Sequence, residues 1–131
     1  LGPERSALQY PIASVAQHGA HVSFGSDWPV TTPDPLQGLA VAVTRRNRRG
    51  EPVGGWTPDE RLPVFAAIAA ATAGTAYQAF DDLERGAVTV GRRADLALLD
   101  ADVTAIDGHD LRDVRVVGTW ADGRAIHRVA D

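Results

Sequence analysis

The hydrophobic residues of this chain change their spacing once, near Leu83, and that change constrains the fold more than any other feature. Before it, up to Phe80, apolar residues recur mainly every three or four positions, which indicates helices. After it they alternate with polar residues, which indicates strands. The sequence therefore predicts an α/β protein with a helical part over residues 1–82 and a β-rich part over residues 83–131.

The helical part contains a single strand-like run. A periodic apolar stretch predicts a helix that ends at Gly19, and the run over residues 20–24 predicts a strand that stops at Gly25-Ser26-Asp27. A lone strand of the parallel type cannot complete a sheet, because such strands are buried on both faces. Residues 1–80 are therefore expected to belong to a larger structure.

Further helices are predicted before residue 82. Asp34 offers an N-cap with Pro35 at the first helical position, which is a typical helix start. Thr57 and Glu60 have the spacing of a capping box ahead of an alanine-rich stretch. The predicted helices cover residues 35–45, 64–73 and 76–80.

The β-rich part ends in a hairpin signal. Asp122-Gly123 suits a tight turn, because both residues tolerate positive φ. Gly86 and Gly91 are expected to allow turns around a short strand, and Asp95 is expected to hydrogen-bond nearby amides. The predicted strands cover residues 87–90, 94–100, 114–120 and 125–127.

The composition excludes several classes of protein. The 131 residues contain no cysteine, which removes thiolate metal sites and cysteine nucleophiles. A formal net charge of -4 argues against a uniformly basic nucleic-acid binder, and no run approaches the roughly 18 apolar residues of a membrane helix. No nucleic-acid or membrane partner is therefore expected, and the predicted location is the cytoplasm. Because methionine is absent, Leu1 is not an ordinary translation start, and the chain is expected to be a fragment or a processed product.

Asp27 is the first candidate for chemistry. It follows a predicted strand, where a carboxylate can bind a metal ion and accept a proton from water. The alternative is an aspartate that caps exposed amides in a turn. The histidines offer no comparable cluster: His18 and His21 fall on different predicted elements, while His109 and His127 are expected to be solvated.

The basic and aromatic residues leave alternatives open. The cluster over residues 45–49 could recognise a carboxylate or phosphate, because guanidinium groups pair bidentately with such anions, or it could be a solvated loop. Trp28 and Trp56 could line the mouth of a pocket or fill space between parts of the fold. Trp120 lies in the predicted hairpin and is expected to be structural.

Several motifs follow one another along nearly the whole chain. In chain order they are Gly25-Ser26-Asp27-Trp28-Pro29-Val30 with Pro35-Leu36, Thr44-Arg45, Trp56-Thr57-Pro58-Asp59-Glu60-Arg61, Ala71-Thr72 with Ala76, Glu84-Arg85-Gly86, the string from Gly86 to Asp100, and Val117-Gly118-Thr119-Trp120-Ala121-Asp122-Gly123-Arg124. This ordered set resembles the C-terminal portion of metal-dependent amidohydrolases, in particular the YtcJ-like branch (amidohydrolase family 3). The most specific motif is G-x-x-x-x-G-x-x-A-D-L-A-L-L-D, which in that family marks the small β domain beside the barrel.

The resemblance implies a fold and a site. Residues 1–82 would form the last strand and flanking helices of a (β/α)8 TIM-type barrel, and residues 83–131 strands of a small β domain, a composite β-sandwich. It also implies a divalent metal, Zn²⁺, most of whose ligands lie outside this chain, because no His-x-His pair is present. Of the metal ligands only Asp27 carries over, and it would serve as base toward the attacking water and then as acid toward the leaving nitrogen. Trp28 and Arg45 are the implied substrate-binding residues.

Two function hypotheses follow. In the first, the chain is a fragment of a metal-dependent hydrolase that acts on the carbon–nitrogen bond of a small non-peptide amide or cyclic amide, and is inactive by itself. In the second, it is a catalytically inactive interaction module that associates with itself or with a partner, so a homo-oligomer is one expected state. An anion or nucleic-acid binder that uses residues 45–49 is a third possibility, which the negative net charge disfavours.

Overall fold

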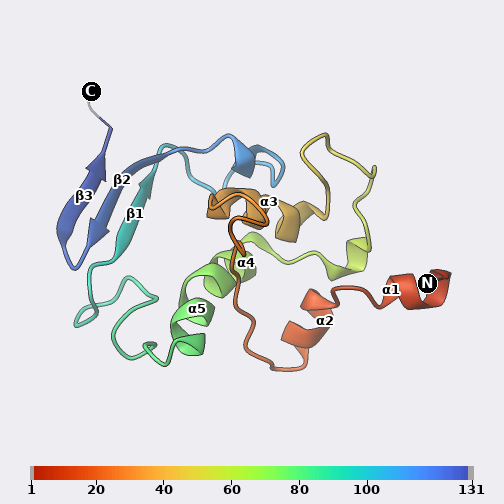
Figure 1. The fold of residues 1–131 in the computed structure, drawn as a ribbon, viewed down its shortest axis with the longest axis horizontal. Helices are drawn as coiled ribbons and strands as arrows, with labels where there is room; N and C mark the ends of the chain where they lie inside the picture. The colour runs from red at the N-terminus through yellow and green to blue at the C-terminus, as the bar shows by residue number, and fades with distance from the viewer. Residues whose placement is uncertain (1, 130–131) are drawn as a thin grey trace.

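Helices and strands are separated in space. The computed structural model describes residues 2–129. Its helices are α1 (Pro3–Ala7), α2 (Ile12–Gln17), α3 (Pro35–Thr44), α4 (Val64–Ala71) and α5 (Ala73–Gln78), with two short 3-10 helices, η1 (Pro58–Glu60) and η2 (Asp110–Arg112). Its strands β1 (Leu96–Leu99), β2 (Val116–Ala121) and β3 (Arg124–Arg128) form one antiparallel sheet in that order. The sheet lies at one end of the molecule and α1 and α2 at the other, with α3 and α4 between them (Figure 1). The prediction of an α/β chain with a β-rich C-terminal part is therefore confirmed.

Helix α3 is at the centre of the hydrophobic core. As predicted, Asp34 caps it: the Asp34 Oδ1 accepts a hydrogen bond from the Leu36 amide at 3.0 Å, and Pro35 occupies the first turn. The helix ends at Arg45, whose φ of 56° is left-handed. Its apolar face packs on α4 and η2. The buried cluster consists of Ala13, Leu36, Leu39, Ala40, Ala42, Leu62, Ala67, Leu111 and Val114.

Two members of this core come from the β-rich part of the chain. Leu111 is fully buried, and Val114 lies beside it in the same cluster. Polar contacts reinforce the docking of η2, because the Gln37 side-chain amide donates a hydrogen bond of 3.0 Å to the Arg112 carbonyl. The helical and β-rich parts therefore share one core within the described residues.

The strand predicted over residues 20–24 is not formed in the described structure, where the segment is neither helix nor strand. A strand needs a hydrogen-bonded neighbour, and none lies beside it within residues 2–129. The helix predicted before it is divided into α1 and α2, with Pro11 as the N-cap of α2. That helical stretch does end at Gly19, whose φ is 84°.

The predicted capping box ahead of α4 is also wrong. Thr57 adopts a left-handed conformation with φ 46° and makes no side-chain cap. Glu60 instead accepts hydrogen bonds from the Ser14 amide, at 2.9 Å, and from the Ser14 hydroxyl. These two hydrogen bonds hold the pKa of the Glu60 carboxyl below its ordinary value. Ser14, 46 residues away in sequence, therefore binds the Glu60 carboxylate that the local spacing assigned to the cap.

The interruption in the alanine-rich region lies earlier than predicted. Thr72, with φ -120° and ψ -82°, separates α4 from α5. Gly74 and Thr75, which were expected to break the helix, lie inside the first turn of α5. The break leaves carbonyl groups at the end of α4 without helical partners, as at every helix C-terminus.

The hairpin of the β-rich part is confirmed. Asp122 and Gly123 have φ of 51° and 77° and connect β2 to β3. Asp95 acts as predicted, because its Oδ1 accepts a hydrogen bond of 2.8 Å from the Asp122 amide. Gly86 and Gly91 both adopt positive φ, 90° and 92°. The strand expected between them, at residues 87–90, is wrong, since those residues pair with no strand in the described part of the chain.

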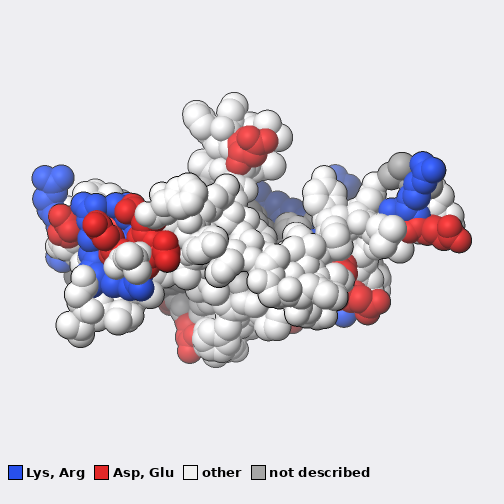
Figure 2. All heavy atoms as spheres, turned by 90° about the horizontal axis from the view of Figure 1, so that it is seen from below, with Lys and Arg blue, Asp and Glu red and all other residues white. Residues whose placement is uncertain are grey.

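Charged side chains are unevenly distributed over the surface. On the face shown in Figure 2 they gather toward the two ends of the molecule, and the middle is largely uncharged. Several large apolar side chains are exposed, among them Phe65, Phe80 and Val90. Within residues 2–129, no helix has both the length and the apolar character needed to cross a membrane.

Candidate active site

Asp27 lies in an exposed turn directly after the irregular segment 20–24. Its φ is 52°, a left-handed conformation that aspartate and asparagine adopt more readily than most residues. The Val30 amide donates a hydrogen bond of 2.8 Å to the Asp27 carbonyl and closes the turn. No residue between 2 and 129 donates a hydrogen bond to the Asp27 carboxylate, so both of its oxygens can meet water or a substrate.

Trp28 follows Asp27 in the same turn and presents its ring to solvent. The side chain is 66% exposed. Ser26 organises the turn: its hydroxyl accepts a hydrogen bond of 3.3 Å from the Trp28 amide, and its carbonyl accepts one from the Thr31 hydroxyl. The turn therefore displays an acidic and a large apolar side chain side by side in sequence, which suits a substrate with a polar group and an apolar substituent.

Arg45 lies in the interior of the described structure. It is only 7% exposed, and its Nε donates a hydrogen bond of 3.1 Å to the Trp56 carbonyl. Its Nη2 donates another, of 2.6 Å, to the Thr57 hydroxyl. The guanidinium also lies over the Trp56 ring, 5.2 Å from its centroid, and Tyr10 meets the same ring edge-on at 6.0 Å. Arg45 thus holds the connection between α3 and η1 in place.

The other arginines of residues 45–49 do not form one patch with it. The Arg46 carbonyl accepts a hydrogen bond of 2.7 Å from Arg112 Nη2. Arg48 and Arg112 line a groove of about 590 Å³, and Asp34 and Asp113 also line it. Burial and the nearby Arg48 charge lower the pKa of Arg112. Because the groove carries both signs of charge, it is not a simple anion site.

The described residues do not fit a catalytic metal ion on their own. In residues 2–129, no three histidine, cysteine, aspartate or glutamate side chains are placed so that they could hold a metal ion. Catalytic zinc sites use three protein ligands, so the single Asp27 carboxylate could only be one member of such a set. His18 and His127 are exposed, whereas His109, predicted to be solvated, is partly buried.

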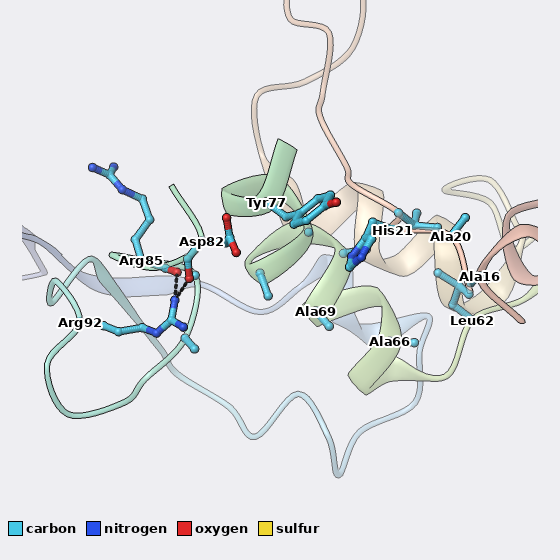
Figure 3. Close-up of a pocket in the computed structure, with 16 residues that line it drawn as sticks. Ala16, Ala20, His21, Leu62, Ala66, Ala69, Tyr77, Asp82, Arg85 and Arg92 are labelled. Atoms are coloured by element: carbon cyan, nitrogen blue, oxygen red, sulfur yellow. Dashed lines mark hydrogen bonds between the residues drawn. The ribbon is translucent and has the colours of Figure 1, made fainter. Parts of the chain in front are cut away.

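A mostly apolar pocket of about 470 Å³ lies against α4 and α5 and is lined largely by alanines (Figure 3). His21 and Tyr77 stack at its edge, with ring centroids 3.9 Å apart and planes 15° apart. On the other side, Arg92 donates hydrogen bonds to the carbonyls of Asp82 and Arg85, as the dashed lines of Figure 3 show. Sequence reasoning did not identify Tyr77, because its partner His21 lies 56 positions away and no local pattern links them.

Comparison with known proteins finds one family profile and several curated relatives that are similar to this chain. A family profile described as "Amidohydrolase family" matches residues 1–127. The chain is 32% identical over 114 residues to the N-substituted formamide deformylase of Arthrobacter pascens, covering 87% of this chain and 20% of that protein. It is 29% identical over 127 residues to "Putative amidohydrolase YtcJ" of Bacillus subtilis (strain 168), covering 97% of this chain and 24% of that protein.

A third relative has a name that describes no chemistry. The chain is 30% identical over 128 residues to Protein LONG AFTER FAR-RED 3 of Arabidopsis thaliana, covering 97% of this chain and 21% of that protein. The chain therefore spans between 20% and 24% of the length of these curated relatives. No solved structure matches the chain significantly.

Proposed function

Because this chain belongs to the amidohydrolase family, we propose that the protein hydrolyses a carbon–nitrogen bond of a small amide and that Asp27 moves the proton in that reaction. The main support for this proposal is the turn at Asp27. There an exposed carboxylate, with no hydrogen-bond partner in the described residues, lies next to the exposed Trp28. A carboxylate in this setting can accept a proton from the attacking water and then donate it to the leaving nitrogen.

An N-substituted formamide is the proposed substrate class, with a cyclic amide as the second candidate. The support is the name of the Arthrobacter pascens relative, a deformylase of such compounds. Trp28 is the proposed contact for the apolar substituent on nitrogen, since its ring is exposed beside the carboxylate. A substrate contact by Arg45 remains a prediction, because two of its donor atoms are already engaged within the chain.

The barrel and the metal ion belong to the same proposal. Residues 20–27 would form the end of the last strand of a (β/α)8 barrel, and residues 83–131 part of a β-sandwich. The absence of a strand partner for residues 20–24 within residues 2–129 supports this, because that segment has an alternating pattern without a sheet to join. Asp27 would be one ligand of a divalent cation, Zn²⁺, with the remaining ligands on polypeptide outside this chain.

The decisive experiment uses the protein at its full natural length with formanilide, an N-substituted formamide, and measures release of formate. Asp27→Asn keeps the left-handed turn but cannot accept a proton, so kcat should fall by roughly 10²- to 10⁴-fold. Asp59→Asn is the matched control, an exposed aspartate in η1, and should leave the rate unchanged. Equal activity of the Asp27→Asn variant and the unmodified protein would refute the assignment.

A second candidate function has its own observation. Phe80 and Val90 are almost fully exposed, and Phe65 projects from α4, so the chain presents apolar surface that another polypeptide could cover. A self-associating module predicts that the 131-residue chain forms concentration-dependent dimers in sedimentation velocity, and that Phe65→Ser weakens them. A monomer at all concentrations would remove this candidate.

A further inference from the structure

Within the described residues, helices α4 and α5 hold the segment that leads to Asp27. Residues 21–24 run along α5 and the end of α4, and each of the four makes a contact with these helices. The His21 ring stacks on Tyr77, as Figure 3 shows, and the Ser23 hydroxyl donates a hydrogen bond to the Gln78 side chain. The position of Asp27 therefore depends on how these helices meet the segment.

The backbone of Phe24 is fixed from both sides. Its amide donates a hydrogen bond of 3.1 Å to the Ala70 carbonyl, one of the carbonyls that the break at Thr72 leaves without a helical partner. The Thr75 hydroxyl lies 3.4 Å from the Phe24 carbonyl and 3.2 Å from the Ala70 carbonyl, so its one proton can be donated to either of them. The interruption of the helix thus creates the acceptor that anchors the segment.

Gly74 makes the close approach possible. A Cβ atom at this position would overlap the Val22 carbonyl oxygen and lie 3.1 Å from the Val22 carbonyl carbon. Both of these are backbone atoms, which cannot rotate away as the end of a flexible side chain can. Gly74 has no positive φ that would require glycine, and glycine is a poor helix former. The close contact with Val22 is therefore the reason for a glycine here.

We propose that Gly74 and Thr75 are positioning residues: by fixing the backbone of residues 22–24 against the α4–α5 junction, they set the place of Asp27 and Trp28. The consequence for catalysis rests on the proposed function of Asp27, whereas the structural coupling does not. Only two residues, Gly25 and Ser26, separate the anchored segment from Asp27, so a displacement of the Val22 backbone is transmitted along a short stretch of chain.

The test is a pair of glycine-to-alanine variants in the protein at its full natural length. Gly74→Ala forces the Val22 backbone to move. Gly38→Ala is the matched control, because this glycine also lies inside a helix, α3, and a Cβ there would meet no atom within 4 Å. The protein is labelled with 5-fluorotryptophan, and the ¹⁹F resonance of Trp28 is assigned with a Trp28→Phe variant.

The expected result is a shifted Trp28 resonance in Gly74→Ala and an unchanged one in Gly38→Ala, with the Trp120 resonance unchanged in both. In the formanilide assay kcat should fall about tenfold or more in Gly74→Ala, because misplacement by about 1 Å is costly for a catalytic group. Identical Trp28 resonances in Gly74→Ala and the unmodified protein would overturn the proposal.

A second pair of variants covers the case in which Gly74→Ala does not fold. Thr75→Val removes the hydroxyl at nearly constant volume, and Thr75→Ser retains it. The proposal expects Thr75→Val to shift the Trp28 resonance and lower kcat, and Thr75→Ser to restore both. It fails if the two variants behave alike. Failure of the proposed function is recognised separately, because Asp27→Asn would then remain active whatever the Trp28 resonance shows.

Discussion

Replacement of Leu111 by alanine tests whether the β-rich part of the chain shares its core with the helical part. Leu111 is 0% exposed and lies in η2, packed in the cluster around α3. The substitution removes three buried carbons, a transfer cost of about 2.4 kcal/mol at about 0.8 kcal/mol per carbon. The cavity left behind raises the expected loss of stability to about 3 kcal/mol. For a chain of 131 residues this corresponds to a fall in Tm of about 10 °C.

The assay is urea unfolding of the 131-residue chain, followed by far-UV circular dichroism and by tryptophan fluorescence. Both probes should report one shared transition that moves to lower urea in Leu111→Ala, with an unchanged m-value. Leu8→Ala is the control, because Leu8 is 74% exposed and its removal should change stability by less than about 0.5 kcal/mol. A loss below about 1 kcal/mol for Leu111→Ala, or two separate transitions in the unmodified chain, would refute the single shared core.

Three other predictions concern the surroundings of the candidate site. Because the pKa of Glu60 is lowered in the folded chain, its carboxylate contributes fully to stability above its ordinary pKa, and this contribution is lost as the pH falls through the lowered pKa. The Tm should therefore fall on acid titration, and the fall should be smaller in Ser14→Ala. Arg45→Lys should lower stability by about 1–2 kcal/mol in urea unfolding, because lysine cannot replace both hydrogen bonds of the buried guanidinium; a changed KM at unchanged stability would instead indicate a substrate contact. After dialysis against Zn²⁺, the 131-residue chain should retain no stoichiometric zinc by mass spectrometry, because it offers Asp27 without a cluster of further ligands in residues 2–129; one bound zinc per chain would contradict this.

Features set by adjacent residues could be predicted from the sequence. The start of α3 follows from Asp34 and Pro35, because a cap needs only the side chain and the amides of the next turn. The hairpin follows from Asp122-Gly123, because two consecutive positive φ angles favour those residue types. The amidohydrolase family could also be predicted from the sequence, because its motifs follow one another in order along the chain.

Features that depend on a distant partner were missed or assigned wrongly. Glu60 has the spacing of a capping box with Thr57, yet its carboxylate accepts hydrogen bonds from Ser14 instead. A substrate contact by Arg45 stays a prediction, but the sequence did not show that its guanidinium also binds Trp56 and Thr57 in the interior. Nothing in the local pattern around these residues distinguishes the two outcomes, because a hydrogen-bonding side chain takes the partner that the fold brings to it.

Asp27 has both kinds of feature: its chemistry could be predicted from the sequence, and the contacts that position it could not. Its residue type and its place after an alternating run made it a candidate, and the resemblance to the amidohydrolase family implied its role as acid and base over that of an aspartate that caps a turn. Only the tertiary structure showed which described residues hold the segment before it, namely Gly74, Thr75 and the end of α4. The physical reason is that chemistry resides in one side chain, whereas its position is fixed by backbone contacts between segments about 50 residues apart.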